Sequence, residues 1–146
     1  MKFYAVIDTN VIVSSMLSHS SNPGLIIDHV VAGNIISLLN EEILKEYLNV
    51  LTRNKFGFDD ITIKETIDAI KKNAIYLSRD QTIEDFIDKD DIVFFEIVMS
   101  ARSTMDAYLI TGNIKHFPVR SYVVTPREMI EIIEKEKCMV SQIDSK

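Results

Sequence analysis

The chain has 146 residues, the size of one ordinary domain, and 47% of them are apolar and 26% charged. These fractions exclude a disordered or fibrous chain. The 22 acidic and 16 basic residues give a net charge of −6, which argues against a protein that holds nucleic acid through a broad basic face. The charge is compatible with a nuclease whose active site is itself a cluster of carboxylates.

Short apolar runs alternate with segments of helical periodicity, which predicts an α/β domain with a largely parallel sheet. In chain order, the pattern predicts a strand at 3–7, a helix after 8–10, a helix at about 23–31, a strand at 35–39, a helix at 41–53, a helix at 61–73, an edge strand at 74–77, a helix from about 89 through 98, a strand at 107–110, a short strand at 122–124 and a final helix from 126. We expect one domain over residues 1–136 and a loose tail over 137–146.

Polar residues and glycine predict where several helices begin or end. Asn40 is placed to cap the helix that starts at residue 41. Thr125 and Glu128 form a predicted capping box, with Pro126 at the first helical position. Gly33 is placed to end the helix before the second strand.

The single cysteine, Cys138, excludes an internal disulfide and a thiolate zinc site, so we expect an intracellular, cytoplasmic protein. No signal peptide is predicted, because the first apolar run has only five residues before Asp8. The uncharged stretch 9–27 contains too many polar residues to cross a bilayer, so no membrane association is expected.

Polar side chains stand where apolar elements end or begin. Asp8 and Asn10 follow the first strand, Asp91 starts a helix, and Thr111 and Asn113 follow a later strand. Ligands of open α/β sheets bind at the carboxyl ends of the strands. If the strands are parallel, Asp8 and Asn113 share one edge, and a helix that begins beside them brings Asp91 in as well.

Each of these acidic residues also has a purely structural interpretation. Asp90 and Asp91 suit a helix N-terminus, which favours carboxylates. Glu46 has charged neighbours, so its spacing alone favours a solvated helix residue, and Asp106 suits a turn before its strand. Asp8 is the strongest candidate, because a carboxylate at the end of a buried strand costs free energy unless it is paired or bound to a metal.

Converging carboxylates repel one another, and a divalent cation relieves that repulsion. Oxygen ligands without cysteines or paired histidines favour Mg²⁺ or Mn²⁺ over zinc, and such ions typically serve phosphoryl chemistry. His116 lies near the predicted site and is a weaker candidate for a phosphate contact. A phosphotransferase with Asp8 as nucleophile is disfavoured, because the haloacid-dehalogenase pattern needs a second Asp where Asn10 stands.

Five stretches, taken together in their order and spacing, resemble one known family over residues 3–133. They are 6–14 (VIDTNVIVS), 39–47 (LNEEILKEY), Asp90-Asp91, 107–113 (AYLITGN) and 125–128 (TPRE). The pattern is similar to that of the PIN-domain family, in particular bacterial members regarded as toxins of toxin–antitoxin systems and related to the VapC toxins. The resemblance implies a Rossmann-like three-layer sandwich, with a parallel sheet of about five strands between helices.

The resemblance also implies a ribonuclease that depends on Mg²⁺ or Mn²⁺. Asp8, Glu46 and Asp91 match the family's catalytic, metal-binding acids, and Asn10 matches the polar companion of the first acid. This match favours a site role for Glu46 over the solvated role that its spacing suggests. The products would carry a 5′-phosphate and a 3′-hydroxyl.

One position departs from the family pattern. Asn113 stands where the family has a fourth acid, so a second metal ion loses one charged ligand. Glu96 and Asp106 are candidates to supply the missing carboxylate, and a Glu at the place of Glu96 recurs in related sequences with Thr-Gly-Asn. Ser14 and Thr111 are expected to orient water or phosphate.

The expected partners are an RNA substrate, a cognate antitoxin protein and a second copy of the chain in a homodimer. Arg53, Lys115 and Arg120 are candidate contacts to the RNA backbone. The leading hypothesis is an endoribonuclease toxin. The alternative, which Asn113 keeps open, is a catalytically weak PIN-like module that binds RNA or protein.

Overall fold

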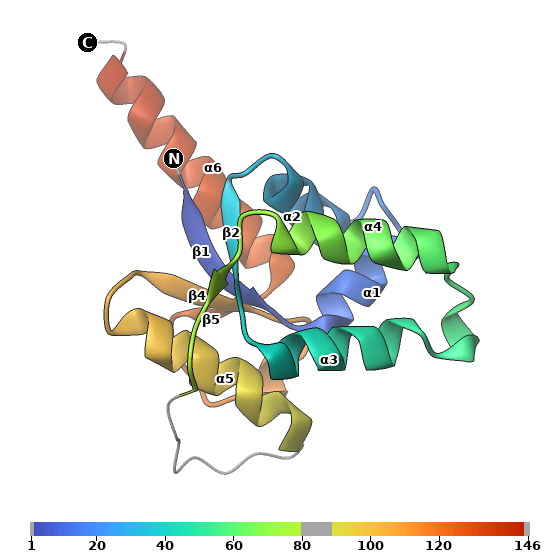
Figure 1. Ribbon diagram of the computed structural model, residues 1–146. Helices are drawn as coiled ribbons and strands as arrows, with labels where there is room; N and C mark the ends of the chain where they lie inside the picture. The colour runs from blue at the N-terminus through green and yellow to red at the C-terminus, as the bar shows by residue number, and fades with distance from the viewer. Residues whose placement is uncertain (1, 80–88, 145–146) are drawn as a thin grey trace.

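Five parallel strands form a sheet in the order β3-β2-β1-β4-β5 (Figure 1). The computed structural model describes residues 2–79 and 89–144. Within these ranges the elements are β1 (Phe3–Ile7), α1 (Thr9–Leu17), α2 (Asn22–Val31), β2 (Ile35–Leu39), α3 (Glu41–Leu51), a 3₁₀ turn η1 (Asn54–Phe56), α4 (Asp60–Lys71), β3 (Ile75–Tyr76), α5 (Lys89–Arg102), β4 (Ala107–Ile110), a second turn η2 (Ile114–His116), β5 (Val123–Val124) and α6 (Pro126–Asp144).

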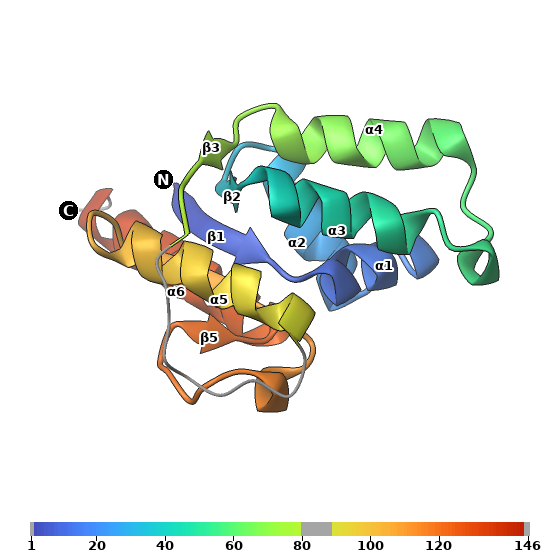
Figure 2. The ribbon, with the colours of Figure 1, turned by 60° about the horizontal axis from the view of Figure 1, so that its bottom comes forward.

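The sheet is buried by helices on both faces. The helix α5 packs across β1, β2 and β4, with α3 beside it, while α2 and α6 pack together on the other face (Figure 2). The last three residues of β1 are fully buried, as expected for the central strand of a parallel sheet. The predicted α/β class with a five-stranded parallel sheet between helices is therefore confirmed.

The predicted capping signals are present. Asn40 accepts a hydrogen bond from the Ile43 amide at 2.8 Å and starts α3. Thr125 and Glu128 exchange side-chain to backbone hydrogen bonds of 2.9 and 3.2 Å, which is the predicted capping box. Gly33 follows α2 with a φ of 84°, a conformation that favours glycine.

Several boundaries differ from the prediction, and α3 and α4 each end two residues early, at Leu51 and Lys71. Asp59 accepts a hydrogen bond from the Thr62 amide at 2.7 Å, so α4 starts at Asp60, one residue early. The last helix continues past residue 136 to Asp144, so the segment from 137, which we expected to be loose, is helical that far. Within the described ranges, none of the helices is both long enough and apolar enough to span a membrane.

The strand order places a crevice beside the central strand. The chain first winds from β1 outward to β2 and β3, and then returns to the other side of β1 with β4 and β5. The order therefore reverses between β1 and β4, and ligands of such sheets bind outside the carboxyl ends of the strands at this reversal. Asp8 and Thr111 are the residues that directly follow β1 and β4.

Candidate functional site

Asp8 is held at the carboxyl end of β1 by its neighbour strand. Its amide donates to the Ile110 carbonyl at 2.9 Å, which extends the ladder between β1 and β4 by one residue. One carboxylate oxygen, Oδ2, accepts a hydrogen bond from the Thr111 hydroxyl at 2.7 Å. Asp8 is only 6% exposed and Thr111 is fully buried. The structure thus brings together two predicted site residues that lie far apart in the chain.

Burial raises the pKa of Asp8 above its ordinary value of 3.8. Hydrogen bonds from Thr111 and from the backbone of Thr9 and Asn10, together with the field of His116, lower the pKa and offset part of this effect. The largest influence is still the loss of water around the carboxylate. An ionised Asp8 is therefore costly, and a cation placed beside it would relieve that cost.

A cavity of about 360 Å³ opens at this edge of the sheet and is lined by all three predicted catalytic acids. Asp8 comes from the end of β1, Glu46 from α3 and Asp91 from the first turn of α5. The predicted secondary residues Asn10, Ser14 and Asn113 line the same cavity, as does the exposed Asp90.

Glu46 reaches the cavity because Tyr47 faces the core. Tyr47 is fully buried, and its hydroxyl donates to the Ile7 carbonyl at 2.5 Å, directly before Asp8. Burial and the nearby Asp8 raise the pKa of Tyr47 well above 10, so the hydroxyl stays a donor. This bond fixes α3 against the end of β1. Glu46 is half-buried at the cavity wall, which differs from the solvated position that its spacing suggests.

Asp91 lies against His116. The side chain of Asp91 is 14% exposed, and its Oδ2 is 3.3 Å from Nδ1 of His116. His116 also lines the cavity, near the acids, as its place in the sequence suggests. The signal for His116 is its position three residues after Asn113, at the end of the turn that follows β4.

The loop after β4 is tied to the loop after β1. The Gly112 amide donates to Oδ1 of Asn10 at 3.2 Å, and the Asn113 amide donates to the Thr111 hydroxyl at 2.9 Å. The Thr111 hydroxyl therefore accepts from Asn113 while it donates to Asp8. Asn10 and Thr111 act here as the groups that orient the loop and the first acid.

The two acids proposed to replace the missing fourth carboxylate lie elsewhere. Glu96 is buried, with 4% exposure, and its Oε1 accepts a hydrogen bond from Nε of Arg79 at 2.8 Å, away from the cavity lining. Asp106 precedes β4, at the opposite edge of the sheet, and its side chain is 82% exposed beside Arg102. The structure brings neither of them to Asp8.

The acids fit a hard divalent cation by their chemistry. Four carboxylates, those of Asp8, Glu46, Asp90 and Asp91, line one cavity with several neutral oxygens, and such ligands are those that Mg²⁺ and Mn²⁺ prefer. Across residues 2–79 and 89–144, however, no three His, Cys, Asp or Glu side chains are grouped closely enough to hold a metal ion. Ion binding would therefore need the carboxylates to turn toward one another.

Basic and aromatic groups border the acids. Arg53 and Phe56, from the turn η1 and the residue that precedes it, line the cavity. Lys115 lines an adjoining cavity of about 320 Å³ that shares Asn113 and His116 with the first. Arg120 is not at the cavity, and its guanidinium lies 6.0 Å from the ring centre of Phe95. Sequence reasoning missed Tyr47 and Phe56, because aromatic residues at these positions also suit a core.

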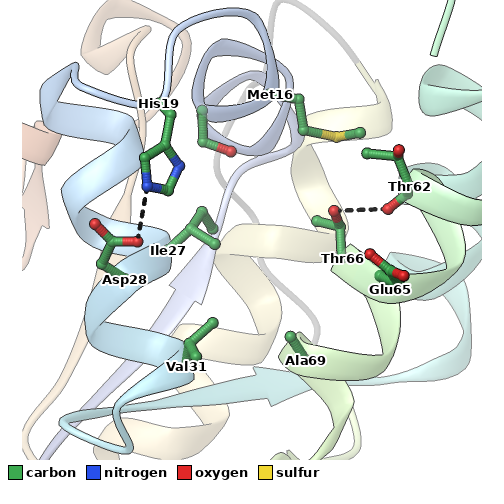
Figure 3. Close-up of a pocket in the computed structure, with 10 residues that line it drawn as sticks. Met16, His19, Ile27, Asp28, Val31, Thr62, Glu65, Thr66 and Ala69 are labelled. Carbon is green, nitrogen blue, oxygen red and sulfur yellow. Dashed lines mark hydrogen bonds and ion pairs between the residues drawn. The ribbon is translucent and has the colours of Figure 1, made fainter.

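A further cavity of about 340 Å³ lies between α1, α2 and α4 (Figure 3). His19 and Asp28 face each other on its wall, with 3.4 Å between Nε2 and Oδ1. None of the predicted catalytic acids lines this cavity. It is a feature separate from the candidate site.

Residues 4–115 match the PIN domain family. The chain belongs to this family. The match spans every element from β1 to β4, and so includes Asp8, Glu46, Asp91 and the Thr-Gly-Asn turn. PIN domains are generally nucleases and typically use a divalent metal ion, which agrees with a carboxylate-lined cavity at the carboxyl edge of the sheet.

A relative of nearly equal length is the uncharacterized protein MJ1680 of Methanocaldococcus jannaschii. It is 26% identical over 151 residues, which cover 92% of this chain and 94% of that protein. No solved structure matches the chain.

Proposed function

We propose that this PIN domain is an endoribonuclease that depends on Mg²⁺ or Mn²⁺ and serves as the toxin of a toxin–antitoxin pair. The observation that carries the proposal is the buried Asp8 at the end of β1, which shares one cavity with Glu46 and Asp91. Three carboxylates from three elements have no evident role in packing there, whereas a cation-assisted reaction needs such a cluster.

The residues that line the cavity would have different roles in the reaction. Asp8, Glu46 and Asp91 would hold the ion, which when bound lowers the pKa of water and neutralises charge on the phosphodiester. The Thr111 hydroxyl orients the Asp8 carboxylate through the hydrogen bond of 2.7 Å. Asn10, Ser14 and Asn113 offer neutral polar groups to water or to the RNA.

The distribution of positive side chains indicates where the RNA would bind. The net charge of −6 opposes a broad electrostatic grip, so the positive contacts have to be local. Arg53 lies on the cavity wall, and Lys115 lines the adjoining cavity. Phe56 adds an aromatic ring at the same wall, on which an unpaired base can stack. We expect the substrate to contact these residues on both sides of the acids.

A cleavage assay tests the nuclease proposal. Purified wild-type protein, Asp8→Asn and Asp106→Asn are incubated with single-stranded and hairpin RNA in the presence of Mn²⁺, Mg²⁺ or EDTA. We expect cleavage by wild-type protein and by Asp106→Asn. The cleavage rate should fall by about 100-fold or more in Asp8→Asn and in EDTA. Equal cleavage by Asp8→Asn would contradict the proposal, because Asp8 is its central ligand.

The toxin role and its partners are tested in cells. Induced expression of the wild-type chain is expected to stop growth, and Asp8→Asn is expected to be harmless at equal protein levels. A small protein that binds the wild-type chain and restores growth would be the antitoxin, and sedimentation of the pure chain would test the proposed homodimer. Unaffected growth with active protein in the cell would separate the toxin role from the nuclease activity.

Two observations favour a second candidate, a catalytically weak module that binds RNA or protein. Asn113 replaces an acid, and no three ligands of the described residues are grouped for a metal ion. This candidate predicts that the wild-type chain binds RNA in fluorescence anisotropy, equally with Mn²⁺ and with EDTA, and cleaves none of the tested RNAs.

A further inference from the structure

Arg79 joins the two helices that carry Glu46 and Asp91. Its Nε donates to Oε1 of Glu96 on α5 at 2.8 Å, and its Nη2 contacts the same oxygen. Its Nη1 donates to Oε2 of Glu42 on α3 at 2.6 Å. A single guanidinium therefore spans both helices, which its planar fork of donors permits and a lysine would not.

The burial of Glu96 makes this contact firm. Glu96 is 4% exposed, and a carboxylate so far from water is strongly destabilising without a charged partner. Glu42 is more open, with 55% of its side chain exposed. The buried half of the bridge therefore anchors Arg79 on α5, and the exposed half ties α3 to that anchor.

The bridge bears directly on the spacing of the acids. Glu42 lies four residues before Glu46, so the two share one side of α3 a turn apart. Glu96 lies five residues after Asp91 in the same helix. Arg79 itself comes just after β3, at the edge of the sheet where the carboxyl ends of the parallel strands meet. A shift of either helix would change the separation between Glu46 and Asp91.

We propose that Arg79 is a positioning residue of the candidate site: by bridging Glu42 and Glu96 it sets the distance between Glu46 and Asp91. Glu96 is then an anchor for this bridge and not a replacement for the missing fourth acid. The inference rests on the proposed function, because its consequence is the affinity of the three acids for a divalent cation.

Five variants, one of them a control, test the bridge by two readouts, the Tm without metal and the affinity for Mn²⁺ measured by electron paramagnetic resonance. Arg79→Leu takes the guanidinium away from the buried Glu96, so both Tm and Mn²⁺ affinity should fall, the affinity by about 10- to 100-fold. Arg79→Lys keeps the positive charge but loses the planar set of donors, so its Tm and Mn²⁺ affinity should fall less than those of Arg79→Leu. The double variant Arg79→Leu/Glu96→Leu removes the buried charge, so Tm should recover while the Mn²⁺ affinity stays low.

Arg102→Leu is the matched control. Arg102 is an arginine at the other end of α5 that pairs with Asp106 at 3.3 Å. We expect its loss to alter Tm and to leave the Mn²⁺ affinity at the wild-type value.

Three results would overturn this inference and leave the proposed function intact. The first is wild-type Mn²⁺ affinity in Arg79→Leu, and the second is recovery of both readouts in the double variant, which would make Arg79 a simple neutraliser of Glu96. An Mn²⁺ affinity that falls in Glu96→Gln but rises in Arg79→Leu would also overturn it and assign Glu96 as a ligand. Absence of Mn²⁺ binding by the wild-type chain would overturn the proposed function, and this inference with it.

Discussion

Asp8 and Asp106 flank neighbouring strands of the same sheet, yet they lie in opposite surroundings. Asp8 follows β1 and is 6% exposed at the reversal of the strand order, with the hydroxyl of Thr111 on its carboxylate. Asp106 precedes β4, and 82% of its side chain is exposed beside Arg102. The acid at the carboxyl edge is therefore shielded from solvent, whereas the acid at the amino edge is solvated.

The comparison teaches that strand direction, more than residue type, decides which acid can do chemistry. At the carboxyl edge, the first turn of α1 and the loop after β4 close over the side chain. At the amino edge, an exposed pair such as Asp106 with Arg102 contributes little to stability. Three measurements test this contrast between the two edges.

The largest expected effect is stabilisation by Mg²⁺. An ion that binds only the folded carboxylates adds about 2.7 kcal/mol to the free energy of unfolding when its free concentration is about 100 times Kd. We expect a rise in Tm with Mg²⁺ for wild-type protein and for Asp106→Asn. In Asp8→Asn the rise should be largely lost. An equal rise in all three proteins would place the binding away from the carboxyl edge.

A medium effect is expected for Tyr47→Phe. The substitution removes the hydroxyl that donates to the Ile7 carbonyl and leaves that buried oxygen without this donor. Chemical unfolding should show a loss of about 1–3 kcal/mol. Tyr76→Phe is the control, because Tyr76 is 52% exposed on β3, and its substitution should cost less than about 0.5 kcal/mol. Equal losses in the two variants would show that the bond to Ile7 does not stabilise this edge.

The smallest effect concerns Asp8 in the absence of metal. Because the folded pKa of Asp8 is raised above 3.8, the folded chain binds more protons than the unfolded chain in that window. The contribution of Asp8 to stability therefore falls as the pH rises from 3.8 through the folded pKa. Asp8→Asn avoids this fall, so at pH 7 we expect it to have a higher Tm than the wild-type protein.

The same pH series separates the two edges. The advantage of Asp8→Asn should shrink as the pH is lowered toward 3.8, whereas Asp106→Asn should stay within about 0.5 kcal/mol of the wild type at every pH. A constant advantage of Asp8→Asn at all pH values would mean that the buried charge is not its cause.

Much of the fold could be predicted because its elements carry local signals. The strands at 3–7, 35–39 and 107–110 have the predicted bounds, since each is a buried apolar run closed by polar residues. The two edge strands are shorter than their apolar runs, because only two residues of each pair with a neighbour. The extension of α6 to Asp144 is not predicted from the mixed residues 137–144 (KCMVSQID), but a helix that has already started extends without a new nucleation cost.

The candidate site could be predicted only in part. Asp8 and Asp91 stand at ends of elements, where a sequence shows them, and all three predicted acids line one cavity. The place of Glu96 depends on Arg79 and Glu42, which come from other elements, and no local pattern encodes such a three-way contact. Glu96 contacts the guanidinium of Arg79 and does not line the cavity of Asp8.

The hydrogen bond between Asp8 and Thr111 joins residues that are 103 positions apart in the chain. During synthesis, the first acid emerges from the ribosome long before the strand that completes its surroundings. A nascent chain that ends before β4 carries Asp8 without the Thr111 hydroxyl, the neighbouring carbonyl of Ile110 or the loop that follows. The surroundings of Asp8 are thus complete only after about three quarters of the chain has been made.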